Sequence, residues 1–369
     1  MSNDGIIAIT MPKWGLSMQE GKLMEWLVDE GTSLKPGDPV MDIETEKIAN
    51  TFEALDAGVL RRKVAQVDEV LPIGALLGVL APADVDDAAI DAFIIEFQAN
   101  YVPPEPDEAE GDGGWATIDA GGYRLRYARM GDGARTIILI HGFGGGADRW
   151  AFTQEPLAAT ASVYAFDLPG HGASSKAVAD GSVTALADIV IAFMDALDIT
   201  SASLVGHSLG GAVALQAAIS HPDRVESLAL IAPAGLGREI NTAYLDGFIT
   251  CDNRKEMKSL LQQLVADADL VNRNLVNDML QFKRIDGVPE ALQTIADGFR
   301  DSDGQTLDLR PGLAELKMPV KVIWGDADQI IPATQAGDLP PNVEVHVLPG
   351  YGHLVQLEAV AEVNALLGA

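Results

Sequence analysis

The chain has 369 residues, of which 48% are hydrophobic and 21% are charged, a composition typical of folded globular proteins that argues against a disordered or fibrous one. Its 54 acidic residues outnumber its 25 lysines and arginines and give a formal net charge of −29, which argues against nucleic acids and anionic membranes as partners. A single cysteine, Cys251, excludes an intrachain disulfide, and the N-terminal residues have no signal-like apolar core, so the sequence predicts a cytoplasmic protein.

The length favours two domains, and the first is predicted over residues 1–82. Short β-rich segments alternate here with Gly and Pro, which predicts an all-β flattened sandwich of hairpins. The segments form a weak internal repeat with an offset of 37 residues, in which Gly21, Leu23, Leu34 and Gly37 correspond to Gly58, Leu60, Leu71 and Gly74, and Gly31 to Asp68. If the two halves are related by a pseudo-two-fold axis, Lys47 lies at the end of the domain opposite its two termini.

The segment between the domains, residues 83–114, has two parts. Residues 85–100 place apolar side chains at helical spacing beside acidic ones, which predicts a short amphipathic helix. This helix either docks a partner subunit or packs back on the chain's own domains, and the sequence leaves both roles open. The following stretch, YVPPEPDEAEGDGG, is rich in proline and acidic residues and is predicted to be an extended linker.

The second domain is predicted over residues 115–369. Apolar β-like runs alternate with helical stretches, a rhythm typical of a mostly parallel sheet covered by helices. The runs are TIILI, VYAFD, ASLVG, SLALIA, VKVIWG and VEVHVL. At about residues 236–305 polar helical sequence interrupts the rhythm, so we expect an inserted cap there.

The motif GHSLGG at residues 206–211 follows a strand-like run and precedes a helix-like one. Ser208 is therefore predicted to lie on a sharp strand-to-helix turn, where the small residues Gly206 and Gly210 permit a strained backbone and leave the hydroxyl exposed. Taken alone, a G-x-S-x-G motif is as compatible with a structural role as with a nucleophile. A serine also needs a neighbouring base that is itself held by a third group.

Both further groups occur downstream, each after a strand-like run. VIWGDADQIIP offers Asp326 and Asp328, and LPGYGHLVQLE offers His353. The order of serine, acid and histidine resembles that of the α/β-hydrolases. The first segment is also similar to the W-G-x-x-D-x-x-x-P pattern of that family, in which the second acid is catalytic, so the resemblance favours Asp328 over Asp326.

An oxyanion hole is predicted from two backbone N–H groups. One belongs to Leu209, the residue after the nucleophile, and the other to Phe143 in the HGFGGG segment after the run TIILI. HGFGGG lacks the Gly-Lys-Ser/Thr ending of a phosphate-binding loop. The other histidines show no metal-ligand spacing, and Cys251 has no activating neighbour in the sequence, so we predict no metal site and an inert cysteine.

Residues 6–80 resemble biotinyl/lipoyl-attachment domains through MPKWGLSMQEGKLMEWLVDEG, KPGDPVMDIETEK and PIG. In that family the lysine of the I-E-T-[DE]-K turn carries lipoate, whereas biotin acceptors usually have methionines beside the lysine. The resemblance therefore implies lipoyl attachment at Lys47, with an ordinary exposed turn lysine as the alternative. The sequence departs from the family at Ile48, where alanine is usual, and at Asp68, where a turn glycine is usual.

The order of lipoyl domain, acidic linker and α/β-hydrolase-fold domain is similar to that of the acetyltransferase components of acetoin dehydrogenase complexes. This resemblance implies lipoate on Lys47 and coenzyme A as co-substrate. It also implies two partner enzymes, a thiamine-diphosphate-dependent enzyme that cleaves acetoin and a dihydrolipoamide dehydrogenase, and it allows a homo-oligomer. The acyltransferase components of other 2-oxo acid dehydrogenase complexes carry H-x-x-x-D-G, which this chain lacks, so their large core assembly is not implied.

Three hypotheses for the second domain stay open at this stage. In the first, it transfers an acetyl group from lipoyl-lysine to coenzyme A through Ser208, His353 and Asp328. In the second, it hydrolyses an ester, a thioester or a carbon-carbon bond, and the lipoyl domain localises it to a complex. In the third, the fold only docks partners. Cap cations that could contact the phosphates of coenzyme A are Arg238, Arg254, Lys255 and Lys258, but the pattern favours ordinary solvated charges for these residues.

Overall fold

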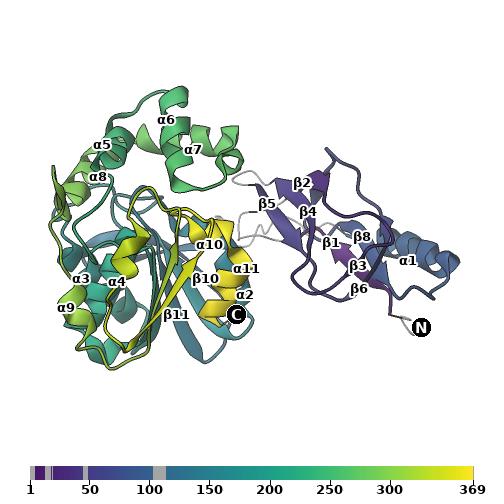
Figure 1. Cartoon of the computed structure of the whole chain (residues 1–369), viewed down its shortest axis with the longest axis horizontal. Coiled ribbons are helices and arrows are strands. Elements are labelled where there is room, and N and C mark those ends of the chain that lie inside the picture. The colour runs from purple at the N-terminus through teal and green to yellow at the C-terminus, as the bar shows by residue number, and fades with distance from the viewer. Residues whose placement is uncertain (1–4, 13–17, 19, 45–48, 103–113, 369) are drawn as a thin grey trace. The chain divides into compact units, whose positions relative to one another are not determined.

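The computed structural model describes residues 5–12, 18, 20–44, 49–102 and 114–368 (Figure 1). The chain forms two compact units, residues 1–113 and residues 114–369. In the described part of the chain, no helix combines the length and the apolar character needed to cross a membrane.

The first unit is built from two four-stranded antiparallel sheets. One sheet has the order β1 (Ile7–Thr10), β8 (Leu76–Ala81), β6 (Gly58–Lys63), β3 (Ser33–Leu34). The other has the order β5 (Ala49–Glu53), β4 (Pro39–Glu44), β2 (Glu20–Trp26), β7 (Val70–Pro72). Their inner side chains share one apolar core, so the predicted flattened β-sandwich is confirmed.

The internal repeat appears in the hydrogen bonds between the halves. The N–H of Gly31 donates to the carbonyl of Leu60 at 2.7 Å, and the N–H of Asp68 donates to the carbonyl of Leu23 at 2.8 Å. Each bond maps onto the other when the two halves are exchanged, as a pseudo-two-fold relation requires. Asp68 has a positive φ of 70°, close to the 91° of Gly31, so the aspartate adopts the left-handed conformation for which the family uses glycine.

The predicted lipoyl-attachment residue Lys47 lies outside the described residues. It belongs to the connection between β4 and β5, which pair antiparallel up to Glu44 and Ala49. Its position relative to the termini of the domain therefore remains a prediction.

Helix α1 (Asp87–Asn100) packs back on the first unit. All six residues of β8 are buried, because one set of its side chains faces the sandwich core and the other faces this helix, where Ile90 is fully buried. Arg61 fixes the start of the helix by donating to the carboxylate of Asp87 at 2.7 Å and to the carbonyl of Val85 at 3.0 Å. Of the two roles left open for this segment, the structure shows packing on its own domain.

The second unit contains an eight-stranded, mostly parallel sheet. The strand order is β18 (Val343–Leu348), β17 (Val320–Gly325), β14 (Val225–Ile231), β13 (Ala202–His207), β11 (Arg135–Ile140), β12 (Ala161–Phe166), β10 (Tyr123–Met130), β9 (Trp115–Ala120). Only β10 breaks the parallel order, because it pairs antiparallel with both of its neighbours, β12 and β9. The predicted α/β-hydrolase fold is confirmed.

Helices cover both faces of this sheet (Figure 1). Along β11, Ile137 and Leu139 pack towards one side while Ile138 and Ile140 pack towards the other, the alternation expected of a strand buried on both faces. One side is covered by α2 (Ala151–Ala158), α10 (Val355–Glu358) and α11 (Val360–Leu367), and the other by α3 (Val183–Ala196), α4 (Leu209–Ser220) and α9 (Arg310–Leu313).

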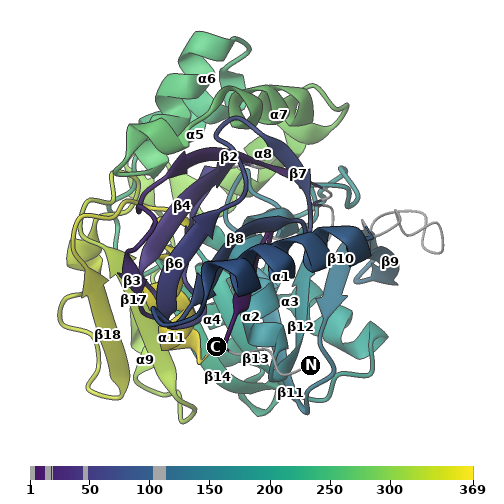
Figure 2. The same ribbon diagram turned by 90° about the vertical axis from the view of Figure 1, so that its right-hand side faces the viewer.

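A helical cap lies between β14 and β17, at the top of the view in Figure 1 and again in Figure 2. It comprises α5 (Thr242–Thr250), α6 (Arg254–Leu261), α7 (Arg273–Lys283), α8 (Val288–Asp297) and the short strands β15 (Arg300–Asp301) and β16 (Gly304–Gln305). Three of the helices begin at an asparagine whose side chain accepts a hydrogen bond from the first turn: Asn241, Asn253 and Asn272. The remaining turns are the 3-10 helices η1 (Ala147–Trp150), η2 (Pro222–Arg224), η3 (Gln262–Leu264), η4 (Ala268–Leu270) and η5 (Ala333–Ala336).

Candidate active site

Ser208 lies on the sharp turn between β13 and α4. Its φ of 55° and ψ of −118° place a residue with a side chain in a strained region of the backbone map. A Cβ atom on Gly206 would lie 2.2 Å from the carbonyl oxygen of Gly210, and a Cβ on Gly210 would lie 2.2 Å from that of Ile140. Both glycines are therefore required for the turn that presents the Ser208 hydroxyl.

His353 and Asp328 meet beyond the ends of β18 and β17. The His353 Nδ1 and Asp328 Oδ2 atoms are 2.7 Å apart, and the two side chains are 3% and 0% exposed. Since the carboxylate accepts a hydrogen bond from Nδ1–H, the neutral ring has the tautomer that leaves Nε2 as an acceptor. His353 and Ser208 line the same pocket.

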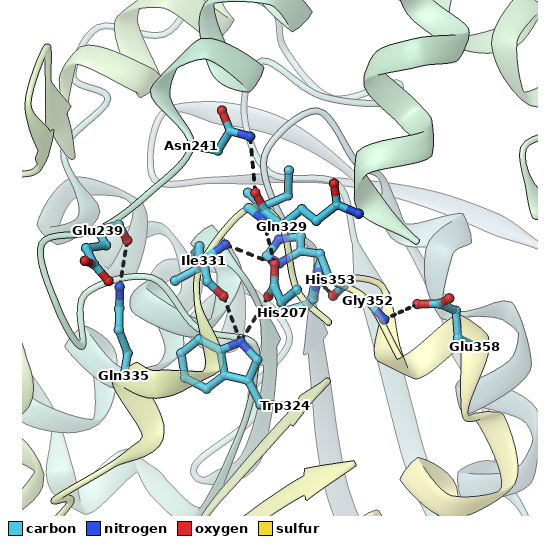
Figure 3. A network of polar contacts seen from close by, with 12 residues as sticks. His207, Glu239, Asn241, Trp324, Gln329, Ile331, Gln335, Gly352, His353 and Glu358 are labelled. Atoms are coloured by element: carbon cyan, nitrogen blue, oxygen red, sulfur yellow. Dashed lines mark hydrogen bonds and ion pairs between the residues drawn. The ribbon is translucent and has the colours of Figure 1, made fainter. Parts of the chain in front are cut away.

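Asp328 accepts hydrogen bonds from four donors, of which Figure 3 labels His353, Trp324 and Ile331. Besides His353, Trp324 Nε1 donates to Oδ2 at 3.0 Å, and the amides of Ile330 and Ile331 donate to Oδ1 at 2.8 and 3.0 Å. Burial by itself would raise the pKa of Asp328, but the charge and hydrogen bond of His353 and the two amides outweigh it and hold the pKa below its usual value. The alternative acid, Asp326, is exposed and accepts from the Gly350 amide at 2.7 Å, which makes it a turn residue.

His207 supports the backbone of His353. Its Nε2 donates to the His353 carbonyl oxygen at 2.9 Å, and the two rings lie 4.8 Å apart between centroids. Burial, with the charge of His353 as a smaller contribution, lowers the pKa of His207 to about 3. His207 is therefore a neutral donor at neutral pH, a role that the sequence did not indicate because it comes from a contact across 146 positions in the chain.

The loop that carries Phe143 packs directly on the nucleophile. A Cβ atom on Gly142 would lie 2.9 Å from the Cβ of Ser208. The loop is fixed from below, because the Gly144 amide donates to His171 Nε2 at 3.1 Å and the Gly145 amide donates to the Gly142 carbonyl at 3.1 Å. Phe143 itself lines the pocket.

Two buried histidines hold this loop in their neutral forms. His141 Nδ1 donates to the Gly142 carbonyl at 2.8 Å while its Nε2 accepts from the Leu168 amide at 2.9 Å. His171 donates in the same way to the Pro169 carbonyl at 3.0 Å. Burial lowers the pKa of both rings, to about 3 for His171, so each keeps one donor and one acceptor nitrogen. Their expected structural role fits these contacts.

Leu209, the second predicted oxyanion donor, is the first residue of α4 and is buried. An N–H at the first position of a helix has no acceptor within the helix, and the helix N-terminus carries a partial positive charge. The Leu209 amide is therefore suited to bind a negatively charged oxygen beside Ser208.

The pocket above Ser208 is lined by loops at the ends of the sheet strands and by the cap. Its walls are mainly apolar, and the cap contributes Tyr244, Phe248, Leu261, Leu264, Met279 and Phe299. Arg149 is the one Asp, Glu, Lys or Arg among the described residues that line it. Its guanidinium is partly buried and donates to the weak acceptor Met279 Sδ at 3.5 Å. Arg149 was not predicted from the sequence, since nothing but its position shortly after HGFGGG marks it.

Two buried polar atoms of lining residues have no hydrogen-bond partner among the described residues. They are Trp150 Nε1, a donor, and Gln356 Oε1, an acceptor, on side chains that are 0% and 1% exposed. An unpaired buried polar atom costs about 1–3 kcal/mol.

The remaining candidates lie away from this pocket's chemistry. Arg238 is paired with Asp301 at 3.2 Å, whereas Arg254, Lys255 and Lys258 are exposed on α6. Burial raises the pKa of the Cys251 thiol, which disfavours the reactive thiolate. Among the described residues, no group of three or more His, Cys, Asp or Glu side chains is placed to hold a metal ion.

Two protein families match this chain. Residues 135–360 match the family described as alpha/beta hydrolase fold, and residues 7–80 match the family described as biotin-requiring enzyme. The first match covers more than half of the chain, so the chain belongs to the α/β-hydrolase-fold proteins.

Relatives of nearly full length are also similar to this chain. The dihydrolipoyllysine-residue acetyltransferase component of the acetoin cleaving system of Cupriavidus necator is 48% identical over 364 residues, which are 98% of this chain and 96% of the relative. The protein of the same name from Pseudomonas putida is 47% identical over 361 residues, 97% of this chain and 96% of the relative. Among solved structures, a meta-cleavage product hydrolase from Pseudomonas fluorescens is 25% identical with a TM-score of 0.63, and the match covers 68% of this chain and 95% of that one.

Proposed function

The chain belongs to the dihydrolipoyllysine-residue acetyltransferase components of acetoin cleaving systems, and from this premise we propose that Ser208, His353 and Asp328 transfer the acetyl group from a lipoyl group on Lys47 to coenzyme A. The chain is thus an acyltransferase with covalent lipoate and with coenzyme A as its acceptor. The observation that carries the site assignment is the buried 2.7 Å contact between His353 and Asp328, in a fold that presents Ser208 to the same pocket.

The lipoyl group, when attached, supplies the acetyl group as a thioester. Ser208 Oγ attacks the thioester carbonyl while His353 Nε2 takes the hydroxyl proton, and Asp328 stabilises the imidazolium that results. The amides of Leu209 and Phe143 stabilise the oxyanion, and each such donor is typically worth about 10²- to 10³-fold in rate. His353 then gives its proton to the departing thiolate, which leaves the acetyl group as an ester on Ser208.

The second half-reaction reverses these roles. The thiol of coenzyme A gives its proton to His353 Nε2, and its sulfur attacks the acetyl carbonyl. The bond to Ser208 Oγ breaks, and the serine takes the proton back from His353. Water competes for the same acyl-serine, so transfer depends on a positioned thiol, and well-oriented groups reach effective molarities of about 10⁵ M or more. The apolar walls of the pocket favour this outcome because they hold little water.

Contacts to the acceptor follow from the polar atoms that line the pocket. Arg149 offers a positive charge to the anionic coenzyme in a chain with a net charge of −29.

The name of the relatives describes a component of a multienzyme system. For this chain we propose two partners from the chemistry of the cycle. A thiamine-diphosphate enzyme that cleaves acetoin must load the acetyl group, and a dihydrolipoamide dehydrogenase must reoxidise the dithiol that remains after transfer. Assembly into a homo-oligomer stays a prediction.

Mixing two full-length variants tests the proposal. Lys47→Arg removes the attachment lysine and Ser208→Ala removes the nucleophile, so each alone is expected to be inactive, while the mixture forms acetyl-coenzyme A through lipoyl groups of one chain and serines of the other. Acetyl-coenzyme A and free acetate are both measured, with intact mass as the check on lipoylation. If the wild-type protein released only acetate, whether or not coenzyme A was added, the domain would be a hydrolase. Full activity in Ser208→Ala would make it a docking module.

A further inference from the structure

Glu358 connects the catalytic histidine loop to the cap. It is the last residue of α10, five positions after His353. One carboxylate oxygen, Oε2, accepts from the Gly352 amide at 2.7 Å, a contact that Figure 3 shows. The other, Oε1, accepts from the Ala266 amide at 2.7 Å and from the Asp267 amide at 3.3 Å. The two oxygens therefore bind two segments that lie far apart in the sequence.

The two segments are packed closely on each other. A Cβ atom on Gly352 would lie 2.8 Å from the Ala266 nitrogen and 2.8 Å from the Val265 carbonyl carbon, so only glycine fits. The amide of Leu354 donates to the Leu264 carbonyl at 2.9 Å. Both neighbours of His353 in the chain are thus tied to the cap residues 264–267, one through Glu358 and the other directly.

A second connection joins the cap to the loop of the catalytic acid. The backbone N–H of Asn241 donates to the Ile330 carbonyl at 2.8 Å. The Asn241 Nδ2 donates to the Gln329 carbonyl at 3.2 Å (Figure 3). Asn241 is also the first-turn cap of α5, where its Oδ1 accepts from the Tyr244 amide at 2.9 Å. The loops that carry His353 and Asp328 therefore both depend on contacts with the cap.

We propose that Glu358 is a positioning residue, which holds His353 in its reactive place only while the cap segment 264–267 lies against the histidine loop. A carboxylate is required because it has two acceptor oxygens and can serve two sets of N–H donors at once. An amide at this position would have one acceptor, and its NH₂ group would face a backbone N–H.

The proposal concerns how the site becomes active and rests on the proposed role of His353. The lipoyl arm and coenzyme A must both reach a pocket that the cap partly covers, so the cap has to admit and release them. Since the histidine loop is bonded to the same segment, a displaced cap also displaces the base. His353 is therefore in position to act as the base only when the pocket is closed. While the pocket is open the base is displaced, and this limits the attack of water on the acyl-serine.

The chain offers a matched control. Glu362 on α11 also accepts a hydrogen bond from the histidine loop, from the Tyr351 hydroxyl at 3.2 Å, but it is exposed and this contact does not involve the cap. Glu358→Gln and Glu362→Gln make the same chemical change four residues apart. Asn241→Asp removes the side-chain part of the second connection, the Nδ2 donor to the Gln329 carbonyl, together with the Nδ2 bond to Gln263. It keeps the backbone bond to Ile330 and the oxygen that caps α5.

The experiment measures kcat and KM of the full-length variants for acetyl transfer to coenzyme A and for hydrolysis of p-nitrophenyl acetate. It adds thermal unfolding and hydrogen exchange at the Gly352 and Ala266 amides. We expect Glu358→Gln to lower kcat about 10- to 100-fold in both assays with KM unchanged, since a misplacement of about 1 Å can cost 10²-fold. We expect faster exchange at both amides, a smaller loss of kcat in Asn241→Asp, and wild-type kinetics in Glu362→Gln.

Three outcomes would overturn the proposal: wild-type kcat in Glu358→Gln, an equal loss in Glu362→Gln, or a loss that matches the fraction of unfolded protein. The ester assay needs neither lipoate nor coenzyme A. If the wild-type protein failed to transfer acetyl to coenzyme A, the proposed function would fail, yet the ester assay would still decide the role of Glu358.

Discussion

Replacing Asp328 by asparagine tests the catalytic geometry with a minimal change of shape. The carboxylate now accepts from His353 Nδ1, from Trp324 Nε1 and from the amides of Ile330 and Ile331. In Asp328→Asn the amide oxygen keeps the two backbone donors, so its NH₂ group must face His353. The imidazole can accept that bond only with the proton moved to Nε2, and in this tautomer it can no longer take the proton of Ser208.

The structure separates the effect on rate from the effect on stability. A histidine held in the wrong tautomer lowers kcat about 10⁴-fold. The loss of stability is smaller, because Trp324 Nε1 keeps a second acceptor in the Ile331 carbonyl at 3.0 Å and the new amide is itself bonded. We expect a decrease of about 1.5–3 kcal/mol in the free energy of unfolding, the usual worth of a hydrogen bond to a charged group.

The assay is formation of acetyl-coenzyme A from acetyl-dihydrolipoamide, with urea unfolding in parallel. Asp326→Asn is the control, because an asparagine oxygen can still accept from the Gly350 amide and the residue is exposed. It should keep wild-type activity and change stability by less than about 0.5 kcal/mol. Substantial activity in Asp328→Asn, or an equal loss in Asp326→Asn, would refute the assignment of the acid.

Three further predictions concern the cation of the pocket, the elbow and the buried histidines. Arg149→Gln should raise KM for coenzyme A several-fold, as expected for about 1 kcal/mol from a partly exposed charge, and should leave KM for uncharged pantetheine unchanged; equal effects on both acceptors would exclude a contact with the charged part of the coenzyme. Gly206→Ala should yield insoluble protein, because its Cβ would lie 2.2 Å from a backbone oxygen, whereas Gly247→Ala meets only a flexible leucine and should fold; soluble, active Gly206→Ala would contradict the strained turn. His171 and His207 have pKa values of about 3 in the folded chain, below the ordinary 6.5, so the unfolded chain binds their protons first and stability falls as the pH drops from 6.5 towards 3. Each histidine contributes about 1.4 kcal/mol per pH unit in this window, and urea unfolding between pH 7 and pH 4.5 should show a smaller slope in His171→Gln than in the wild-type protein.

The helix at residues 87–100 shows where a local pattern stops being informative. Its apolar spacing predicted an amphipathic helix, and that helix is present. The same spacing left its partner open, because an apolar face specifies that it must be covered and not by what. The covering surface is the outer face of β8, whose apolar residues could equally have belonged to a strand buried on both sides of a larger sheet.

The sequence alone was sufficient to predict the features in which a strained turn requires particular residue types. The small residues around Ser208, the order of Ser208, Asp328 and His353, and the rhythm of the second domain all depend on neighbours in the chain or on strand order, which the sequence records directly. The preference for Asp328 over Asp326 came from a family pattern, and the structure supplies its physical reason, since the side chain of Asp328 is fully buried against His353 while Asp326 is exposed.

Other features were decided only by the tertiary structure. The support of His353 by His207, the charge of Arg149 in the pocket and the bridge from Glu358 to the cap join segments that are separated by up to 146 positions. A histidine, an arginine or a glutamate in a polar stretch has no periodicity that reports its distant partner, and its hydrogen bonds exist only after the sheet has brought the loops together. The sequence alone predicted which groups react, and the packing of the cap against the sheet decided how these side chains are held.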